Sequence, residues 1–480
     1  MNERFDVVVV GSGAGGGVVA GELADRGRHV LLLELGPHKT AADFTRWEAK
    51  AAHDLWWPIR FALIDGGAGG AVGLIAGRCV GGSTTINTKV ALRAHAKDYA
   101  KWHDASGLAG SHGEPFGASD LDPHYDRVEA RLGVRERTDW SKSVRTVEPG
   151  FRALGSELEP VRSYTDANCM CCGSCLQGCP TNAGKSTLNT YIHDAWAAGR
   201  LELRADSRVE RIVIEDGEAT GVEYVDLDGT TTRIDAGAVV VAAGTLNTPQ
   251  LLRRSALPDT SSTRLVGRNL GFHPARLVYG LFDEPQDAHM VYPITAHAMD
   301  HQHDEDGGFV IEATTIQDPI AFATTLEDEN GPLWGQALVD AVREFRRWVG
   351  LLVMVNDDNN GSVQVDGGEE SFEAAFSAVE RERMAGAFDF TREVLRAAGA
   401  SRVRWTGLIT THVQGTCRMG SDPQRSVVDS DGQSWDVKRL YVGDGSLVPR
   451  TLSVNPSLTI MALATRLADH LHADRHGYLS

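Results

Sequence analysis

The chain has 480 residues, and 65 acidic against 47 basic side chains give it a formal net charge of −18 at pH 7. This balance disfavours binding to nucleic acid or to an anionic membrane, because both require a basic surface. With 42% hydrophobic and 23% charged residues, the composition is that of a globular protein of two or three domains. Disordered and fibrous classes are therefore excluded.

The N-terminus gives an expectation about location. Residues Met1 to Asp6 are charged and lead directly into an apolar stretch, whereas a secretory signal has a basic start and a cleavage site. We therefore expect a cytoplasmic protein. The longest Gly/Ala-rich apolar run, Phe61 to Gly77, contains Asp65 and many glycines, so we expect no membrane span.

The first predicted elements form a strand, a helix and a second strand. Phe5–Val10 is an apolar strand, a glycine-rich turn follows, Val18–Asp25 is helical, and a strand from His29 to Leu33 ends at Glu34. The turn carries the G-x-G-x-x-G spacing at Gly11, Gly13 and Gly16. Such glycines let a pyrophosphate approach the helix N-terminus, and the acid can accept hydrogen bonds from a ribose. The pattern predicts dinucleotide binding without distinguishing FAD from NAD.

Further glycine clusters and strands follow along the chain. The segment Gly77 to Asn87 indicates backbone amides crowding a ligand. The remaining predicted elements are strands at Leu203 and at Val209–Ile214, a hairpin of Gly221–Val225 and Thr230–Ile234, a buried strand at Val239–Gly244, a helix from Thr248 to about Arg253, and, after the segment Leu440–Gly445, a helix at Ser457–Leu471.

Together these motifs resemble the glucose-methanol-choline (GMC) flavin oxidoreductases. The matching segments keep the family's order from end to end: the N-terminal fingerprint, Gly77–Asn87, Ala242–Leu252, Val266–Leu270, His412–Gly420, Asp444 and Asn455–Pro456. The resemblance implies a fold of two parts, an α/β FAD-binding Rossmann-like domain and an α+β substrate domain on an antiparallel sheet. We expect the FAD domain to comprise residues 1–92, 195–275 and 410–480, and the substrate domain residues 93–194 and 276–409, with a cysteine-rich insert at 166–184.

The resemblance also implies the FAD-binding residues. They are Gly11, Gly13, Ala14 and Gly16 at the pyrophosphate, Glu34 at the adenosine ribose, Arg78, Gly81, Gly82, Ser83 and Asn87 near the flavin, Val209 at the adenine, and Ala243, Gly244, Asp444 and Pro456 around the rest of the cofactor. Some relatives attach the flavin covalently to a histidine near Gly82–Thr85. This chain has none there, so we expect non-covalent FAD.

His412 and Asn455 are the predicted catalytic pair. Oxidation of an alcohol removes a hydroxyl proton and a hydride, and histidine suits the proton transfer because its ordinary pKa is about 6.5. His412 matches the family's base, and Asn455 matches the residue that orients the hydroxyl and donates to a developing alkoxide. The alternatives are a structural core histidine and, for Asn455 before Pro456, an N-cap of the last helix.

Five of the seven cysteines lie between Cys169 and Cys179. Cys169, Cys172, Cys175 and Cys179, followed by Pro180, reproduce a ferredoxin spacing, which predicts a [3Fe-4S] or [4Fe-4S] cluster with Cys171 as a neighbour. The alternative is a vestigial or disulfide-closed loop. A cluster would favour a dehydrogenase that passes electrons to an acceptor protein over an oxidase that uses O2.

The substrate is less defined by the sequence. Acidic residues between 273 and 409, such as Asp304, Glu305 and Asp358, are typical of surface loops, although near the site they would favour an aminosugar-like polyol. A sterol or long-chain alcohol would need an apolar tunnel. Trp56, Trp57, Trp334 and Trp348 suit sugar stacking, a tunnel or the core. A functional alternative of another class is a non-enzymatic electron carrier or redox sensor.

Overall fold

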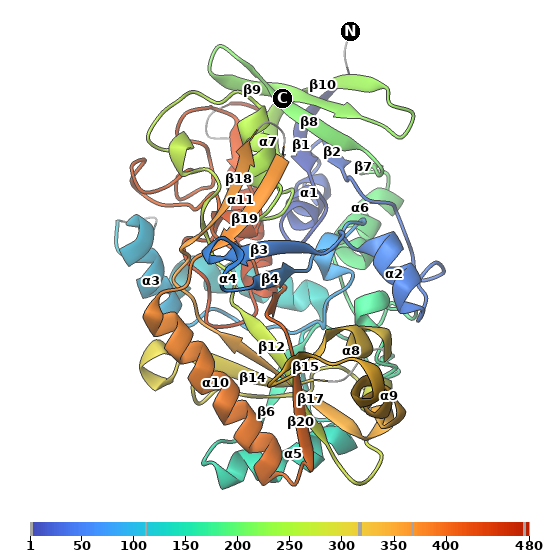
Figure 1. The fold of residues 1–480 in the computed structure, drawn as a ribbon. Helices are drawn as coiled ribbons and strands as arrows, with labels where there is room; N and C mark the ends of the chain where they lie inside the picture. Colours follow the sequence, from blue (N-terminus) through green and yellow to red (C-terminus); the bar gives the residue numbers. More distant parts are fainter. Residues whose placement is uncertain (1–2, 111–112, 315–318, 367–368, 474–476, 480) are drawn as a thin grey trace.

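The computed structural model describes residues 3–110, 113–314, 319–366, 369–473 and 477–479. Two sheets organise the chain (Figure 1). The strands are β1 Arg4–Val10, β2 Val30–Leu33, β3 Arg60–Ile64, β4 Ala71–Leu74, β5 Arg135–Arg137, β6 Glu159–Ser163, β7 Leu201–Arg204, β8 Arg208–Glu215, β9 Glu218–Val225, β10 Thr231–Val241, β11 Arg268–Leu270, β12 Ala275–Leu281, β13 Ala296–Ala298, β14 Phe309–Thr314, β15 Leu326–Asp328, β16 Gly331–Pro332, β17 Trp348–Val355, β18 Gly361–Asp366, β19 Glu369–Ala374, β20 Arg402–Thr406, β21 Ile409–Thr410 and β22 Leu440–Val442.

The helices cover these sheets and connect their strands. They are α1 Gly16–Asp25, α2 Glu48–Leu55, α3 Ala96–Ser106, α4 Ala118–Leu132, α5 Lys142–Ala153, α6 His193–Ala197, α7 Thr248–Arg254, α8 Pro319–Thr325, α9 Gly335–Arg343, α10 Ala378–Ala397 and α11 Ser457–Ala473. Within the described ranges, no helix combines the length and the apolar composition that a membrane crossing requires.

The first sheet is of the dinucleotide-binding type and has the strand order β7-β2-β1-β10-β9-β8, with β22 on β10. Strands β7, β2, β1, β10 and β22 are parallel, and β9 and β8 continue antiparallel from β10. Six of the seven residues of β1 are buried, as parallel strands with both faces covered require. Helix α1 packs against β1 and β2, α11 packs against α1, and α4 packs against α11; all three helices contribute to one core with this sheet.

One predicted boundary in this sheet is wrong. The hairpin strand from Thr230 and the buried strand at Val239 are a single strand, β10. Gly237 lies inside it, and a Cβ there would come within 2.6 Å of the Tyr478 carbonyl oxygen. This glycine does not end the strand; it leaves room for the C-terminal segment to approach β10 closely.

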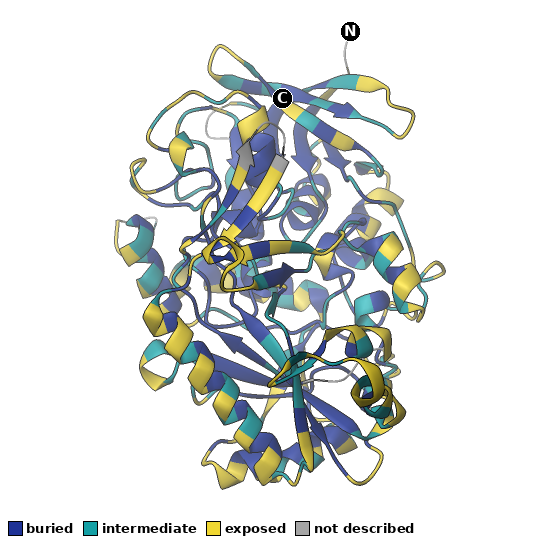
Figure 2. Ribbon diagram, viewed as in Figure 1, coloured by how far each residue is buried: buried dark blue, intermediate teal, exposed yellow. Residues whose placement is uncertain are grey.

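The second sheet is mixed, and most of its pairs are antiparallel. Its central strands β12, β17 and β14 pair antiparallel, whereas β19–β3 and β21–β4 are parallel. Helix α10 lies along this sheet beside α5 (Figure 1), and Ser377 caps it with the reciprocal partner Glu380. The helix presents buried residues to the sheet and exposed ones to solvent (Figure 2).

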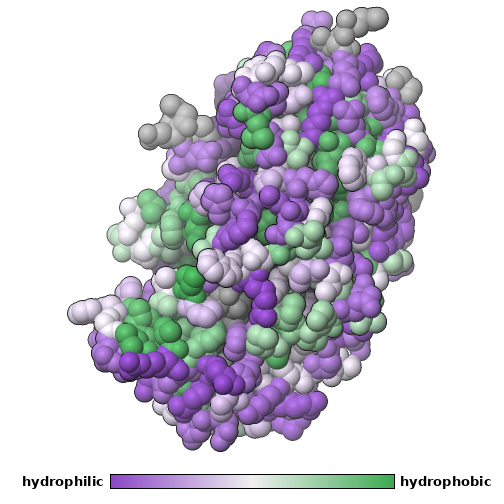
Figure 3. All heavy atoms as spheres, turned by 90° about the vertical axis from the view of Figure 1, so that its right-hand side faces the viewer, coloured by the Kyte–Doolittle hydropathy of each residue, from purple (hydrophilic) through white to green (hydrophobic). Residues whose placement is uncertain are grey.

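The face of the molecule in Figure 3 is mostly hydrophilic, as the charge and composition suggest. On the face that Figure 3 shows, apolar side chains form patches between hydrophilic ones. Several exposed apolar residues lie on or near helices of this side, including Trp47, Ile320 and Trp334. Exposed apolar side chains are common on globular proteins. The predicted domain boundaries stay a prediction, and Met1 and Asn2 of the predicted N-terminal segment lie outside the described residues.

Candidate active site

Three backbone segments come into close contact at the predicted pyrophosphate site, and we call this contact the glycine crossing. A Cβ on Gly11 would lie 2.3 Å from the Ala242 carbonyl oxygen, one on Gly15 1.6 Å from the Gly443 oxygen, and one on Gly16 1.9 Å from the Gly11 oxygen. By contrast, a Cβ on Gly13 would meet nothing within 4 Å. Three glycines therefore let the ends of β1, β10 and β22 meet, and the fourth faces open space.

Two buried carboxylates flank this crossing. Glu34 accepts hydrogen bonds from the Ser12 amide at 3.0 Å, the Ser12 hydroxyl at 2.6 Å and the Gly36 amide at 2.8 Å. Asp444 accepts from the Gly244 amide at 2.8 Å, and the Thr248 hydroxyl donates to the same oxygen at 2.6 Å. Burial raises the pKa of both carboxyl groups.

The segment from Arg78 to Asn87 packs against the crossing. The Gly81 amide donates to the Ser12 hydroxyl at 2.9 Å. The Asn87 amide donates to the Tyr164 hydroxyl at 2.6 Å, which lies 3.0 Å from the Ser457 hydroxyl at the start of α11. The hydrogen bonds thus connect this segment to both the crossing and the last helix.

The other predicted FAD residues lie in distinct surroundings. Arg78 lies over the Trp57 ring at 5.8 Å, and the exposed Ser83 accepts from the Gly77 amide at 3.0 Å. The half-buried Ala14 packs against the first core, the Ala243 amide donates to Thr248, and Val209 and Pro456 are buried. A Cβ on Gly82 would lie 2.9 Å from Gly13 Cα.

The predicted catalytic pair comes together from two distant segments. The Asn455 Nδ2 atom lies 3.5 Å from His412 Nε2. His412 follows β21, where its amide donates to the Thr410 hydroxyl at 3.0 Å. Burial lowers the pKa of His412 to about 4, so the imidazole is neutral at pH 7 and can accept a proton.

Asn455 is not the N-cap of α11. The Ile460 amide donates to the Pro456 carbonyl oxygen at 2.9 Å, which makes Pro456 the capping residue. The Asn455 Oδ1 atom is buried and, among the described residues, has no hydrogen-bond partner. The N-cap alternative is therefore wrong for this side chain.

His273, which is not among the residues predicted from the sequence, lies beside the pair. Its Nδ1 atom lies 3.2 Å from His412 Nδ1, and the two ring centroids are 5.3 Å apart. His273 is buried, and burial lowers its pKa well below 6.5. If His412 Nδ1 donates this hydrogen bond, His412 Nε2 carries the lone pair of the ring and accepts a hydrogen bond from the Asn455 amide at 3.5 Å. No sequence motif marks His273, and its positive φ of 48° is visible only in the structure.

Glu312 on β14 was also missed. Its carboxyl is 1% exposed, and neither oxygen forms a hydrogen bond with the residues that the structure describes, although the Asn455 amide is its polar neighbour and favours its charged form. Burial raises its pKa to about 7. His297 lies directly opposite Glu312 in the β13–β14 pair, and burial lowers the pKa of His297 to about 4. This carboxyl, beside the amide of the predicted catalytic pair, therefore has hydrogen-bonding capacity that the described residues do not use.

The four cysteines with ferredoxin spacing line one small cavity. Cys169, Cys172, Cys175 and Cys179 share its walls with Tyr292 and Gly184. Cys171 lies outside, 3.4 Å from Arg137 Nη2 and 3.6 Å from Asp139 Oδ2. All seven cysteines are free, so the alternative of a disulfide-closed loop is wrong. Across the described parts of the chain, no group of three or more His, Cys, Asp or Glu residues is arranged to hold a metal ion.

A buried ammonium lies between this cavity and the predicted flavin segment. Lys89 is 1% exposed and donates to the carbonyl oxygens of Thr84 and Thr85. Burial lowers its pKa to about 8, and Cys175 and Cys179 oppose this shift. The cysteine loop is also anchored to α2, because the Trp56 indole donates to the Leu176 carbonyl oxygen at 3.0 Å.

The four tryptophans with a predicted role at the substrate differ in their environment. Trp348 is fully buried in a core with Phe322 and Tyr279, so it is neither a stacking platform nor part of a tunnel wall. Trp334 is 83% exposed. Trp56 and Trp57 are half-buried, and the Arg60 guanidinium lies 4.8 Å from the centre of the Trp57 ring.

Comparison with known protein families and structures agrees with this architecture. The GMC oxidoreductase family matches residues 5–275 with its N-terminal model and residues 336–464 with its C-terminal model. The fold resembles that of pyridoxine 4-oxidase from Mesorbium loti, with a TM-score of 0.76, 20% identity and coverage of 98% of this chain and 100% of that one. The expected fold class is therefore confirmed.

Similar sequences include three named proteins. A GMC-type oxidoreductase of Mycobacterium tuberculosis is 32% identical over 97% of this chain and 75% of its own length. A 2-methyl-1,2-propanediol dehydrogenase of Mycolicibacterium austroafricanum is 29% identical over 98% and 95%. A long-chain-alcohol oxidase of Arabidopsis thaliana is 28% identical over 96% and 66%. The chain belongs to the GMC oxidoreductase family.

Proposed function

We propose that this chain is an FAD-dependent dehydrogenase or oxidase that acts on the CH–OH group of an alcohol. GMC oxidoreductases bind FAD, and the residues present suit that cofactor. The open space at Gly13, the carboxylates of Glu34 and Asp444, and the segment Arg78–Asn87 would hold it. When bound, FAD accepts the hydride that leaves the alcohol carbon.

The observation that carries the proposal is the pairing of His412 with Asn455. The neutral His412 imidazole takes the hydroxyl proton at Nε2, and the Asn455 amide donates to the oxygen as negative charge develops on it. A pure electron carrier requires neither group. The proton moves from oxygen to nitrogen while the C–H electron pair leaves as hydride, so the alcohol becomes a carbonyl compound.

Glu312 favours a substrate with a second hydroxyl group. This hydroxyl would donate to the unpaired carboxyl beside Asn455, and a diol or polyol supplies it. Three of the acids that suggested a cationic aminosugar are paired within the chain: Asp304 pairs with Lys101 at 3.0 Å, and Glu305 and Asp358 pair with Lys97 and Arg450. We therefore favour a neutral polyol, and the diol dehydrogenase among the relatives supports this choice.

Anaerobic reduction of the bound flavin tests the proposal. We expect 2-methyl-1,2-propanediol or a related polyol to bleach the flavin faster than the matching mono-alcohol, 2-methyl-1-propanol. The Glu312→Gln variant should reduce this difference. Faster bleaching by a long-chain alcohol would favour the second candidate, which the plant relatives support. If every alcohol fails and the thiols react reversibly with oxidants, the redox-sensor alternative is correct.

The four cysteines stay the proposed ligands of a [3Fe-4S] or [4Fe-4S] cluster. Their shared cavity and the absence of disulfides among the seven cysteines support the proposal. Because the described side chains form no metal-holding arrangement as they stand, we assign no step of the reaction to a cluster. Anaerobic purification with iron and sulfide analysis tests it: Cys175→Ser should lose iron and Cys171→Ser should retain it, whereas iron-free protein after reconstitution removes the idea.

The electron acceptor and the non-covalent binding of FAD are further parts of the proposal. If a cluster is present, an acceptor protein reoxidises the flavin; without one, O2 is the simpler acceptor. FAD is proposed to be non-covalent, so acid should release all the flavin from the precipitated polypeptide. The cytoplasmic location stays a prediction.

A further inference from the structure

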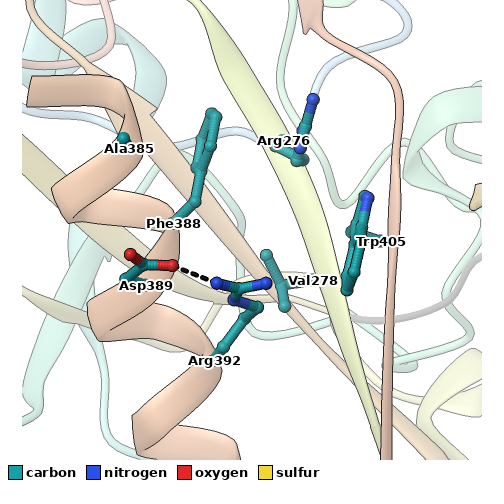
Figure 4. A pocket seen from close by; sticks show the side chains of 7 residues that line it. All are labelled: Arg276, Val278, Ala385, Phe388, Asp389, Arg392 and Trp405. Atoms are coloured by element: carbon teal, nitrogen blue, oxygen red, sulfur yellow. Dashed lines mark hydrogen bonds and ion pairs between the residues drawn. The ribbon is translucent and has the colours of Figure 1, made fainter. Parts of the chain in front are cut away.

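A cavity of about 200 Å³ lies between α10 and the second sheet, and the proposed reaction does not use it (Figure 4). Seven residues line it: Arg276 and Val278 of β12, Ala385, Phe388, Asp389 and Arg392 of α10, and Trp405 of β20. None of them is a predicted catalytic or FAD-binding residue. The four residues of α10 recur at helical spacing and share one face of the helix.

Both arginines in this cavity lack part of their hydrogen bonding. The Nε atoms of Arg276 and Arg392 are buried and have no partner among the described residues. Within the same part of the chain, no carboxylate lies within 4.0 Å of Arg276, whereas Arg392 pairs with Asp389. A buried donor without a partner costs free energy, so each such group in a folded protein requires an explanation.

The charges around the cavity are not balanced. Two guanidinium groups face one lining carboxylate, Asp389, which gives an excess of one positive charge. A second carboxylate, Glu327, lies over Gly407 at the edge of the sheet and favours the charged form of Arg276. Among the described residues, Glu327 forms no ion pair with Arg276 within 4.0 Å, so the Arg276 guanidinium has no direct carboxylate partner.

The remaining walls are apolar and aromatic. The Arg276 guanidinium lies 4.6 Å from the centre of the Phe388 ring, and that of Arg392 lies 5.4 Å from the Trp405 ring. Val278 and Ala385 complete the lining, and Val278 lies directly opposite Trp405 in the sheet. Ligand sites commonly combine apolar walls with a few placed polar groups.

We propose that this cavity binds a small organic monocarboxylate with an apolar or aromatic body. The carboxylate accepts hydrogen bonds from Arg276 and Arg392, a pairing for which guanidinium geometry is well suited. The body of the ligand packs between Phe388 and Trp405. One negative charge balances the excess charge of the cavity, and the volume admits a molecule the size of benzoate.

The holoenzyme can be tested with 4-fluorobenzoate by ligand-observed fluorine NMR, with 4-fluorobenzamide as the uncharged control. We expect 4-fluorobenzoate to bind, to be displaced by unlabelled benzoate and to bind more weakly as salt increases, and the amide to bind at least tenfold more weakly. Arg276→Met and Arg392→Gln should each lower the affinity about tenfold or more, since a hydrogen bond to a charged group is lost.

Arg396→Gln is the matched control variant. Arg396 lies on α10 four residues after Arg392, is exposed and pairs with Glu393, so its loss should leave binding unchanged. The proposal is overturned if 4-fluorobenzoate does not bind at millimolar concentration, if the amide binds equally, or if inorganic phosphate displaces the probe more strongly than benzoate does.

Thermal unfolding separates this role from a purely structural one. If the arginines exist only to hold α10 on the sheet, Arg276→Met lowers the Tm and benzoate changes the Tm of neither protein. The proposal instead predicts that Arg276→Met raises the Tm without anion, because an unpaired buried charge is removed, and abolishes the rise that benzoate produces in the parent protein. If that variant does not fold, Arg392→Gln provides the same comparison.

Discussion

The cofactor side and the alcohol side of the proposed active site are built differently. On the cofactor side, backbones approach one another so closely that Gly11, Gly15 and Gly16 leave no room for a Cβ. On the alcohol side, the contacts are between side chains: His412 with Asn455 and His273, next to the buried carboxyl of Glu312.

This difference determines what each side tolerates. A backbone crossing depends on the absence of side chains, so a single added methyl group disturbs it whatever its polarity. A side-chain cluster depends on chemical identity, so a substitution of equal size can remove its function and leave the fold intact. The predictions below separate these two kinds of dependence.

The largest expected effect is that of His412→Ala. Loss of the base should slow anaerobic reduction of the flavin by alcohol about 10² to 10⁴-fold, the usual contribution of general-base catalysis. FAD should stay bound, because His412 is not part of the glycine crossing. His193→Ala, at an exposed histidine, is the control. Asn455→Ala should cost less, and an unchanged rate in His412→Ala would rule out the assignment.

A pair of glycine substitutions tests the cofactor side. Gly16→Ala places a methyl group within 1.9 Å of the Gly11 carbonyl oxygen, so it should lower the free energy of unfolding of the FAD-free protein by about 1–3 kcal/mol or more. Gly13→Ala meets no protein atom within 4 Å. It should leave the stability of the FAD-free protein near that of the parent and weaken FAD binding at least tenfold. Thermal unfolding and FAD titration measure both, and equal destabilisation would contradict the open cradle.

The same contrast explains what the sequence could predict. The strand, turn, helix and acid from Phe5 to Glu34 are local, so spacing alone predicted them, with β2 beginning one residue later than expected. The prediction of two strands where the structure has one, β10, was wrong. Gly237 lies inside β10 and leaves room for Tyr478, which is far away in sequence. A local pattern cannot contain that contact.

Residues on the alcohol side were predictable only where a family motif marks them. His412 and Asn455 match such motifs, whereas Glu312 becomes notable only because β13 and β14 pair in a register that sets it opposite His297. His273 likewise acquires its role from a contact with a residue 139 positions away. Burial, which shifts the pKa of His412, Glu312 and His273, is a property of the whole fold.

Glu312 should give the alcohol side a pH dependence near neutrality. Its folded pKa of about 7 lies above the ordinary 4.5, so the cost of its charge appears as the pH rises above about 4.5 and is complete above 7. Glu312→Gln should therefore stabilise the protein by up to about 3 kcal/mol at pH 8 and hardly at all at pH 4. It should also remove an inflection near pH 7 from the kcat/KM profile. Glu373→Gln, at an exposed carboxylate on β19, should change neither; persistence of the inflection in Glu312→Gln would contradict the role.

The smallest expected effect comes from His273, which positions His412 without contacting the alcohol. Asparagine is the appropriate replacement, because His273 has a positive φ of 48° and asparagine tolerates that conformation. His273→Asn removes the Nδ1 partner that selects the His412 tautomer, so kcat for flavin reduction should fall about two- to tenfold, in keeping with the ~0.5–1.5 kcal/mol of one hydrogen bond. The KM, the Tm and the FAD affinity should change little.

Nitrogen NMR of the His412 ring gives a readout that a structural role would not affect: the parent should show a single tautomer protonated at Nδ1, and the variant a mixture. A variant that keeps the single tautomer but loses rate would place the cause elsewhere, and one that keeps both would show that the alcohol side orients its base without His273.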